Sequence, residues 1–120
     1  MRLREIKDIL DAEVIVGEDR VDVEVTTAFV ADLMSDVLAY ATQGSLLITG
    51  LTNPQVVRTA DVLDIAAIIL GRGKTLPKET IRLAEELGIP VLTTKYILVE
   101  IVGRLYMKGI RGCIEKVESK

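Results

Sequence analysis

Threonines, glycines and basic residues follow three short apolar runs, and these are the groups that commonly bind anions. The runs occupy residues 46–48, 66–70 and 91–92. Hydroxyl and backbone N–H groups donate hydrogen bonds to a phosphate or carboxylate, and Lys and Arg supply the opposite charge. The candidate ligand-binding residues are Thr49, Gly50, Thr52, Asn53, Arg58, Arg72, Gly73, Lys74, Thr93, Thr94 and Lys95.

The same residues also suit purely structural roles. Asn53 is a good helix N-cap, because its side chain can accept a backbone N–H, and Pro54 suits the first helical position. The glycines would make the turns, and the lysines would be solvated. The sequence therefore leaves two interpretations open, an anion-binding site or a set of caps and turns.

The composition disfavours the common forms of side-chain catalysis. The chain has no histidine and a single cysteine, Cys113. Ser-His-Asp and Cys-His catalysis in their usual forms are therefore excluded, as are zinc sites built on histidine or several thiolates. The acidic pairs at 61/64 and 85–86 are typical of exposed helix surfaces. We expect no catalytic residue, no metal and no cofactor, and thus a protein that is not an enzyme.

One short segment invites comparison with a nucleotide-binding P-loop. Gly73-Lys74-Thr75 matches the end of the pattern G-x-x-x-x-G-K-[ST], but the first glycine of that pattern would fall on Ile68. Pro77 also lacks the backbone N–H that a helix running from the lysine would supply. The sequence therefore does not predict a P-loop.

The elements that position these residues alternate between strands and helices. Each apolar run is followed by a polar turn and then by a helical pattern, which indicates βαβ units and a parallel sheet. Pro77 is expected to begin one of these helices and Gly88 to end it. We predict one α/β domain over residues 1–120, with a mainly parallel sheet and helices on both faces. The turns after residues 48, 70 and 92 should then meet at one edge, where open α/β sheets bind ligands.

The flanking segments give weaker patterns. A helix is expected over 3–11, a strand over 13–16 and a helix over 32–41. The alternation of apolar and acidic residues at 21–25 predicts a strand with one solvated face, whereas 26–30 is ambiguous. A further short strand is expected at 113–117, and the last three residues are expected to fray.

Charge and hydropathy restrict the possible partners. The net charge is −3 with both signs mixed along the chain, which disfavours a nucleic-acid surface, and aromatic residues make up only 3%. No uncharged run reaches the length of about 18 residues that a membrane span needs. The N-terminus lacks the apolar core of a signal peptide, and a lone cysteine fits a reducing compartment. We expect a cytoplasmic protein that binds neither nucleic acid nor membrane.

The segment 96–108 predicts a helix that is apolar on several sides. Such a helix should be buried on the sheet and against something else, and Gly103 in its middle suggests close approach of a neighbour. A symmetric two-fold contact is the commonest way to cover surplus apolar surface. We therefore expect a homodimer.

Several segments between residues 71 and 106 resemble the DRTGG domain family. They are the GRG turn at 71–73, the proline-led helix start at 77–79, AEELGIPVLTT at 84–94, and the TKY helix entry at 94–96 with RLY at 104–106. The same segments are similar to the non-catalytic N-terminal domain of bacterial HPr kinase/phosphorylase. The string D-R-T-G-G itself does not occur, since Val21 follows Asp19-Arg20.

The resemblance implies a parallel α/β domain without an assigned catalytic role. Relatives of this module often accompany ligand-sensing CBS domains or lie beside catalytic domains. We therefore expect a non-catalytic regulatory or protein-interaction module. The alternative is a sensor that binds a small anionic metabolite or nucleotide at the C-terminal edge of the parallel strands.

Overall fold

The computed structural model describes residues 1–118, in which five α-helices, one 3-10 helix and six strands follow one another. The elements are α1 (Leu3–Ile9), β1 (Glu13–Val16), the 3-10 helix η1 (Glu18–Arg20), β2 (Thr27–Val30), α2 (Met34–Tyr40), β3 (Leu46–Thr49), α3 (Pro54–Val62), β4 (Ala67–Leu70), α4 (Lys78–Leu87), β5 (Val91–Thr93), α5 (Leu98–Met107) and β6 (Arg111–Gly112).

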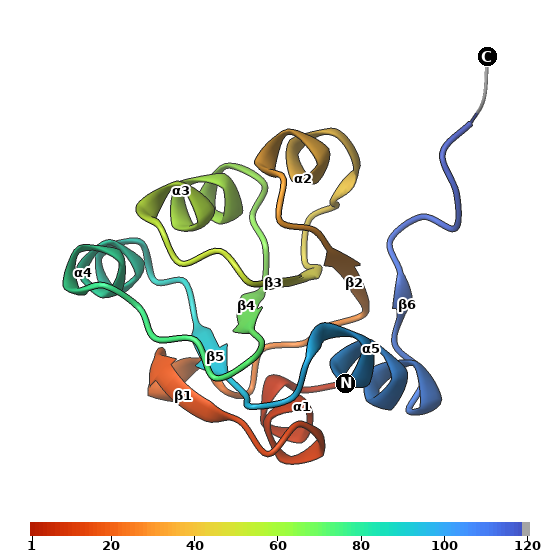
Figure 1. The fold of residues 1–120 in the computed structure, drawn as a ribbon, viewed down its shortest axis with the longest axis horizontal. Coiled ribbons are helices and arrows are strands. Elements are labelled where there is room, and N and C mark those ends of the chain that lie inside the picture. Colours follow the sequence, from red (N-terminus) through yellow and green to blue (C-terminus); the bar gives the residue numbers. More distant parts are fainter. Residues whose placement is uncertain (119–120) are drawn as a thin grey trace.

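The strands form one sheet in the order β1-β5-β4-β3-β2-β6 (Figure 1). All neighbouring pairs are parallel except β1 and β5, which are antiparallel. The mainly parallel sheet expected from the sequence is thus confirmed. Because β3, β4 and β5 are parallel neighbours, the turns after residues 48, 70 and 92 leave the sheet at the same edge.

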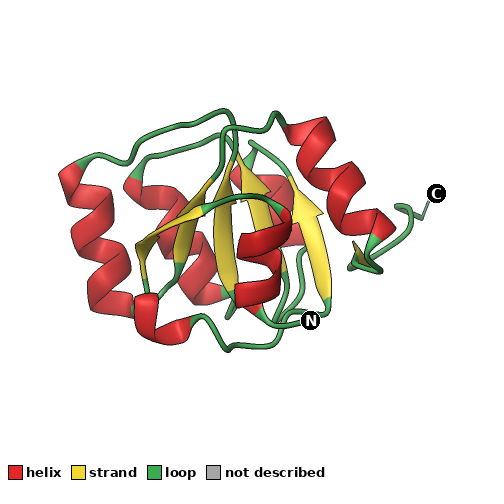
Figure 2. Cartoon of the chain, turned by 90° about the horizontal axis from the view of Figure 1, so that it is seen from below, coloured by secondary structure: helices red, strands yellow, loops and turns green. Residues whose placement is uncertain are grey.

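Helices cover both faces of the sheet (Figure 2). Strand β4 shows the two sides clearly, since Ala67 and Ile69 pack with α1 and α5, whereas Ile68 and Leu70 pack with α2, α3 and α4. All four residues of β4 are buried, as a continuous apolar run in a parallel sheet predicts.

The helix boundaries follow the local signals in the sequence. Asn53 caps α3, its side-chain oxygen accepting the Val56 N–H at 3.3 Å, and Pro54 takes the first helical position. Helix α4 begins at Lys78, one residue after Pro77, and ends at Gly88 in the left-handed conformation (φ 69°). These helices start at the edge of the sheet that carries the candidate residues.

Two expected strands are wrong. Val21 lies in a turn, and residues 23–25 bond to the N-terminal segment rather than to the sheet: Leu3 donates to the Val23 carbonyl at 2.9 Å, and Glu24 forms an isolated antiparallel bridge with Arg2. The alternation of apolar and acidic residues predicted neither the turn at the start of this segment nor the segment that pairs with it. The last strand is β6, before the expected 113–117, because Arg111–Gly112 meet the outer edge of β2. The expected fraying at the C-terminus lies mainly outside the described residues.

Helix α5 is buried on one side only, which corrects the expectation for 96–108. Ile101 and Leu105 are buried, whereas Val99 is 75% and Tyr106 is 55% exposed. The close neighbour expected at Gly103 is also wrong within the described chain, since a Cβ there would meet nothing within 4 Å. No helix in residues 1–118 is long and apolar enough to cross a bilayer.

Candidate functional site

The tight turn after β4 organises the polar edge of the sheet. Lys74 donates its N–H to the Gly71 carbonyl at 3.3 Å, and the two central residues, Arg72 (φ 61°) and Gly73 (φ 65°), are both left-handed. Two left-handed residues in succession are typical of a type I′ turn. The conformation suits Gly73 but is strained at Arg72, because a side chain there crowds the backbone.

Backbone hydrogen bonds hold this turn between its neighbours. Gly71 donates to the Thr49 carbonyl at the end of β3 at 3.3 Å, and Gly73 donates to the Thr94 carbonyl beyond β5 at 2.8 Å. Arg72 donates to the Tyr96 carbonyl at 2.8 Å. The Arg72 side chain therefore projects from a turn that is fixed on both sides.

The structure divides the candidate residues into two groups, and Arg72 belongs to the first. Its guanidinium lies against the Cα of Gly50, so a Cβ at position 50 would collide with it. The Asp32 carboxylate is next to both, accepting the Gly50 N–H at 2.8 Å and the Thr49 hydroxyl at 3.0 Å. We call Asp32, Thr49, Gly50, Arg72 and Lys74 the Asp32 cluster.

The Asp32 cluster keeps its carboxylate ionised. The Gly50 amide lowers the pKa of Asp32 most, the Thr49 hydroxyl lowers it further, and the positive charges of Arg72 and Lys74 act in the same direction. Partial desolvation opposes these effects without overcoming them. An incoming anion would therefore meet two cations that already face a carboxylate.

Asp32 was not among the candidate residues, because residues 26–30 gave no clear pattern. In the structure β2 is parallel to β3, so Asp32, two residues after β2, reaches the same edge as Thr49. The available signal was the apolar segment Ala28–Ala31 followed directly by a polar residue.

The second group lines an open groove of about 480 Å³ at the ends of β4 and β5. One wall consists of Gly73, Thr75, Thr93, Thr94, Lys95 and Tyr96. The other wall comes from the α1–β1 turn and β1, and consists of Leu10, Asp11, Ala12, Glu13 and Ile15. Sequence reasoning gave no role to this second wall, which lies far away along the chain.

Several predicted site residues use their polar groups inside the protein. Thr49 is fully buried, and its hydroxyl donates to Asp32. The buried Thr94 hydroxyl donates to the Leu10 carbonyl at 2.7 Å, and the Thr52 carbonyl accepts the Thr80 hydroxyl at 2.8 Å. Arg58 is exposed on α3 and belongs to neither group. The exposed side chains that remain beside the turns are Arg72, Lys74 and Lys95.

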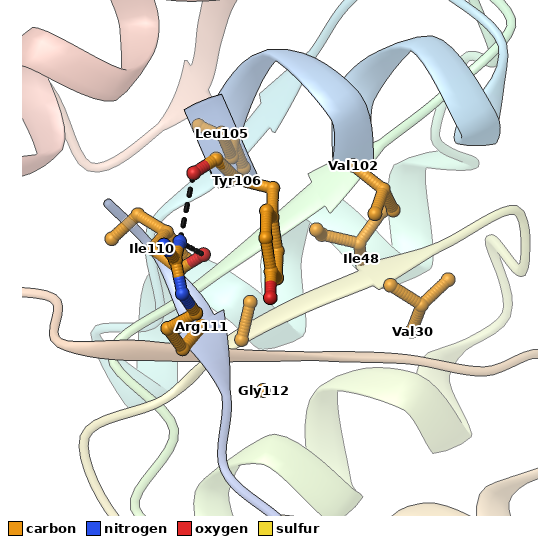
Figure 3. Close-up of a pocket in the computed structure, with 9 residues that line it drawn as sticks. Val30, Ile48, Val102, Leu105, Tyr106, Ile110, Arg111 and Gly112 are labelled. Atoms are coloured by element: carbon orange, nitrogen blue, oxygen red, sulfur yellow. Dashed lines mark hydrogen bonds between the residues drawn. The ribbon is translucent and has the colours of Figure 1, made fainter. Parts of the chain in front are cut away.

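A smaller apolar cavity of about 90 Å³ lies away from this edge, between α5 and the β2–β6 pair (Figure 3). Tyr106 and Arg111 border it, with the Arg111 guanidinium 3.9 Å from the centre of the Tyr106 ring. Val30 and Val102 also face it (Figure 3). The lining of this cavity is mainly apolar, so it suits apolar packing rather than an anion. The polar edge of the sheet remains the candidate ligand site.

An open, mainly parallel sheet with polar turns at its carboxyl edge defines a small α/β domain of the kind that binds ligands or partners at that edge. Within that class the chain belongs to the DRTGG domain family, whose model matches residues 5–106. The resemblance seen in the sequence is thus confirmed.

The fold of this chain is similar to that of a solved structure. The chain is similar to the CBS and DRTGG domains of the regulatory region of Clostridium perfringens pyrophosphatase, complexed with the activator diadenosine tetraphosphate. The identity is 25% and the TM-score is 0.73 over 91% of this chain, which spans only 47% of that chain. The comparison with curated proteins gave no match.

Proposed function

We propose that this chain is a non-catalytic regulatory module. The observation that carries the proposal is its membership of the DRTGG family, together with its likeness to the regulatory region of a pyrophosphatase. The chemistry of the chain agrees, since it has no histidine, and its one cysteine lies near a backbone carbonyl, that of Tyr40 at 3.5 Å. Regulation would then act by binding rather than by turnover, in the cytoplasm.

Such a module could regulate by binding either a protein partner or a small ligand. The specific observation that favours a ligand is the polar edge of the sheet, where Lys95 lines a groove of about 480 Å³ and Arg72 and Lys74 are exposed on the turn after β4. Pockets for small molecules usually enclose about 300–1,000 Å³. The second candidate function is therefore a sensor of a small anionic metabolite or nucleotide.

A thermal-shift screen with nucleotides and phosphorylated metabolites tests the sensor function. A ligand present at 100 times its Kd stabilises the folded state by about 2.7 kcal/mol, which is readily measured as a rise in Tm. The rise should be smaller in Arg72→Ala, Lys74→Ala and Lys95→Ala, and unchanged in Lys108→Ala, an exposed lysine at the end of α5. If no compound raises the Tm, the sensor function is abandoned, and pull-downs with the full chain test the protein-partner form.

We also propose that the module is a homodimer formed through α5. Val99 and Met107 are 75% and 88% exposed on this helix, and the apolar cavity beside Tyr106 continues the same surface. Apolar side chains gathered on one helix are typical of an interaction site.

A further inference from the structure

The groove beside Lys95 joins two parts of the chain that are distant in sequence. The Thr94 hydroxyl on one wall donates to the Leu10 carbonyl on the other at 2.7 Å, and this bond is buried. Glu13 of β1 is also paired with Thr93 of β5 in the antiparallel ladder. The two walls are therefore fixed relative to each other, and the groove exists before any ligand enters.

The two walls carry opposite charges. Asp11 and Glu13 supply carboxylates on one wall, and Lys95 supplies an ammonium group on the other. All three residues are exposed, so their charges are available to a ligand. Asp11 is held in the left-handed conformation (φ 47°) by the turn that follows α1.

Apolar side chains also line the groove. Ile15 lies on the acidic wall and is 37% exposed, and Tyr96 lies on the basic wall. A groove with apolar lining and a few polar groups fixes the orientation of a small molecule through those groups. An inorganic anion alone would gain little here, because the two carboxylates repel it while one lysine attracts it.

We propose that this groove binds a small molecule with an anionic group, an apolar or planar body and an amino group. The inference rests on the sensor function proposed above and adds the class of ligand. The anionic group lies at Lys95, the body packs on Ile15 and Tyr96, and the amino group donates to Asp11 or Glu13. Hydrogen bonds from an amino group to a carboxylate are charge-assisted and strong.

Two matched pairs of probes test the requirement for an amino group. Adenosine monophosphate and inosine monophosphate have the same phosphate, but only the first has an exocyclic amino group. O-Phosphotyrosine carries a cationic ammonium group, which its N-acetyl derivative replaces with a neutral amide. Isothermal titration calorimetry with the full chain should show about tenfold tighter binding of the aminated member of at least one pair, since the lost bond is to a charged group.

Variants of the acidic wall test whether Asp11 and Glu13 cause the preference for the aminated probe. Glu13→Gln, alone and with Asp11→Asn, should reduce the preference toward equal binding, while Glu86→Gln, an exposed acid on α4, should leave it unchanged. Lys95→Ala should weaken all probes that bind. Circular dichroism of each variant verifies that the fold is retained.

The outcomes separate this inference from the sensor function itself. Equal binding of both members in both pairs, with weakening by Lys95→Ala, overturns the amino requirement and leaves an anion sensor. A preference for the aminated probe that persists in the Asp11→Asn/Glu13→Gln double variant also overturns it, because the acidic wall then does not bind the amino group. Failure of all four probes to bind overturns this inference, whereas the sensor function is decided by the wider thermal-shift screen.

Discussion

Asp32 joins the ends of two neighbouring strands through a single carboxylate. It accepts hydrogen bonds from the Gly50 amide and the Thr49 hydroxyl, and it faces the positive charges of Arg72 and Lys74. These contacts lower the pKa of Asp32 in the folded state. Asp32 therefore contributes stability above the pKa of the unfolded chain, and this contribution is lost as the pH falls through the folded pKa.

Replacement of Asp32 tests that linkage. At pH 7, Asp32→Asn should lower the free energy of unfolding by about 0.5–1 kcal/mol, a modest value because the residue is exposed. The difference from the wild type should disappear well below the reference Asp pKa of about 3.9, where the carboxyl group is neutral in both states. Urea unfolding across this pH range measures it, with Asp61→Asn on α3 as the control. A difference that persists in acid would contradict the linkage.

Arg72 shows backbone strain at the same site. Its φ of 61° lies in the left-handed region, which suits glycine better than any residue with a Cβ. Strain that persists at a cationic, exposed turn is a reason to suspect a binding role for the side chain.

Two substitutions at Arg72 separate strain from function. Both Arg72→Gly and Arg72→Ala remove the guanidinium, but only glycine relieves the left-handed conformation. The glycine variant should therefore be more stable than the alanine variant by about 1 kcal/mol in urea unfolding. Equal stability of the two variants would show that the turn relaxes and stores no strain. Both should bind anionic ligands more weakly than the wild type.

At the scale of elements, β1 and the α1–β1 turn extend the sheet beyond its parallel part. Strand β1 runs antiparallel to β5, so Glu13 lies opposite Thr93 at the carboxyl end of β5. The Thr94 hydroxyl then ties the end of α1 to the β5–α5 turn through the Leu10 carbonyl. The groove therefore depends on this buried hydrogen bond, which holds together two elements that are distant in sequence.

Removal of the Thr94 hydroxyl should loosen that packing. Thr94→Val keeps the side-chain shape but leaves the buried Leu10 carbonyl without its donor, so the free energy of unfolding should fall by about 1–3 kcal/mol. Thr93→Val is the matched control, because its hydroxyl donates to the Lys74 carbonyl at 3.0 Å in an exposed position and should matter less. Chemical denaturation compares the two, and equal losses would contradict the role given to the buried bond.

At the scale of the whole molecule, the two faces of the sheet differ in what their helices expose. Helix α5 presents Val99 at 75% and Met107 at 88% exposure, next to the cavity that Val102 and Tyr106 line (Figure 3). On the opposite face Val62 at the end of α3 is 74% exposed and does not border this cavity. This asymmetry supports a dimer through α5.

The pair Val99 and Val62 offers a matched test of the dimer. Val99→Lys should convert a dimer to a monomer, because a charge buried at an interface costs more than the contact gains. Val62→Lys introduces the same charge at equal exposure on the other face and should leave the dimer intact. Size-exclusion chromatography with light scattering at tens of micromolar protein measures both. A monomeric wild type at this concentration would exclude the proposed dimer.

The sequence by itself determined the strand-turn-helix order, the parallel direction of β3, β4 and β5, and the caps at Asn53 and Gly88. These features depend on the period of apolar residues and on local backbone preferences, which are readable within a few neighbouring positions. The resemblance to the DRTGG family came from the same local segments.

Only the tertiary structure decided which polar groups meet. Asp32 reaches Thr49 because β2 pairs beside β3, and Glu13 reaches the groove because β1 turns back along β5. It also showed that 21–25 stays outside the sheet and that α5 leaves Val99 exposed. The physical reason is that pairing and packing join residues far apart in the chain, such as Thr94 and Leu10, which lie 84 positions apart. No local pattern records such a contact.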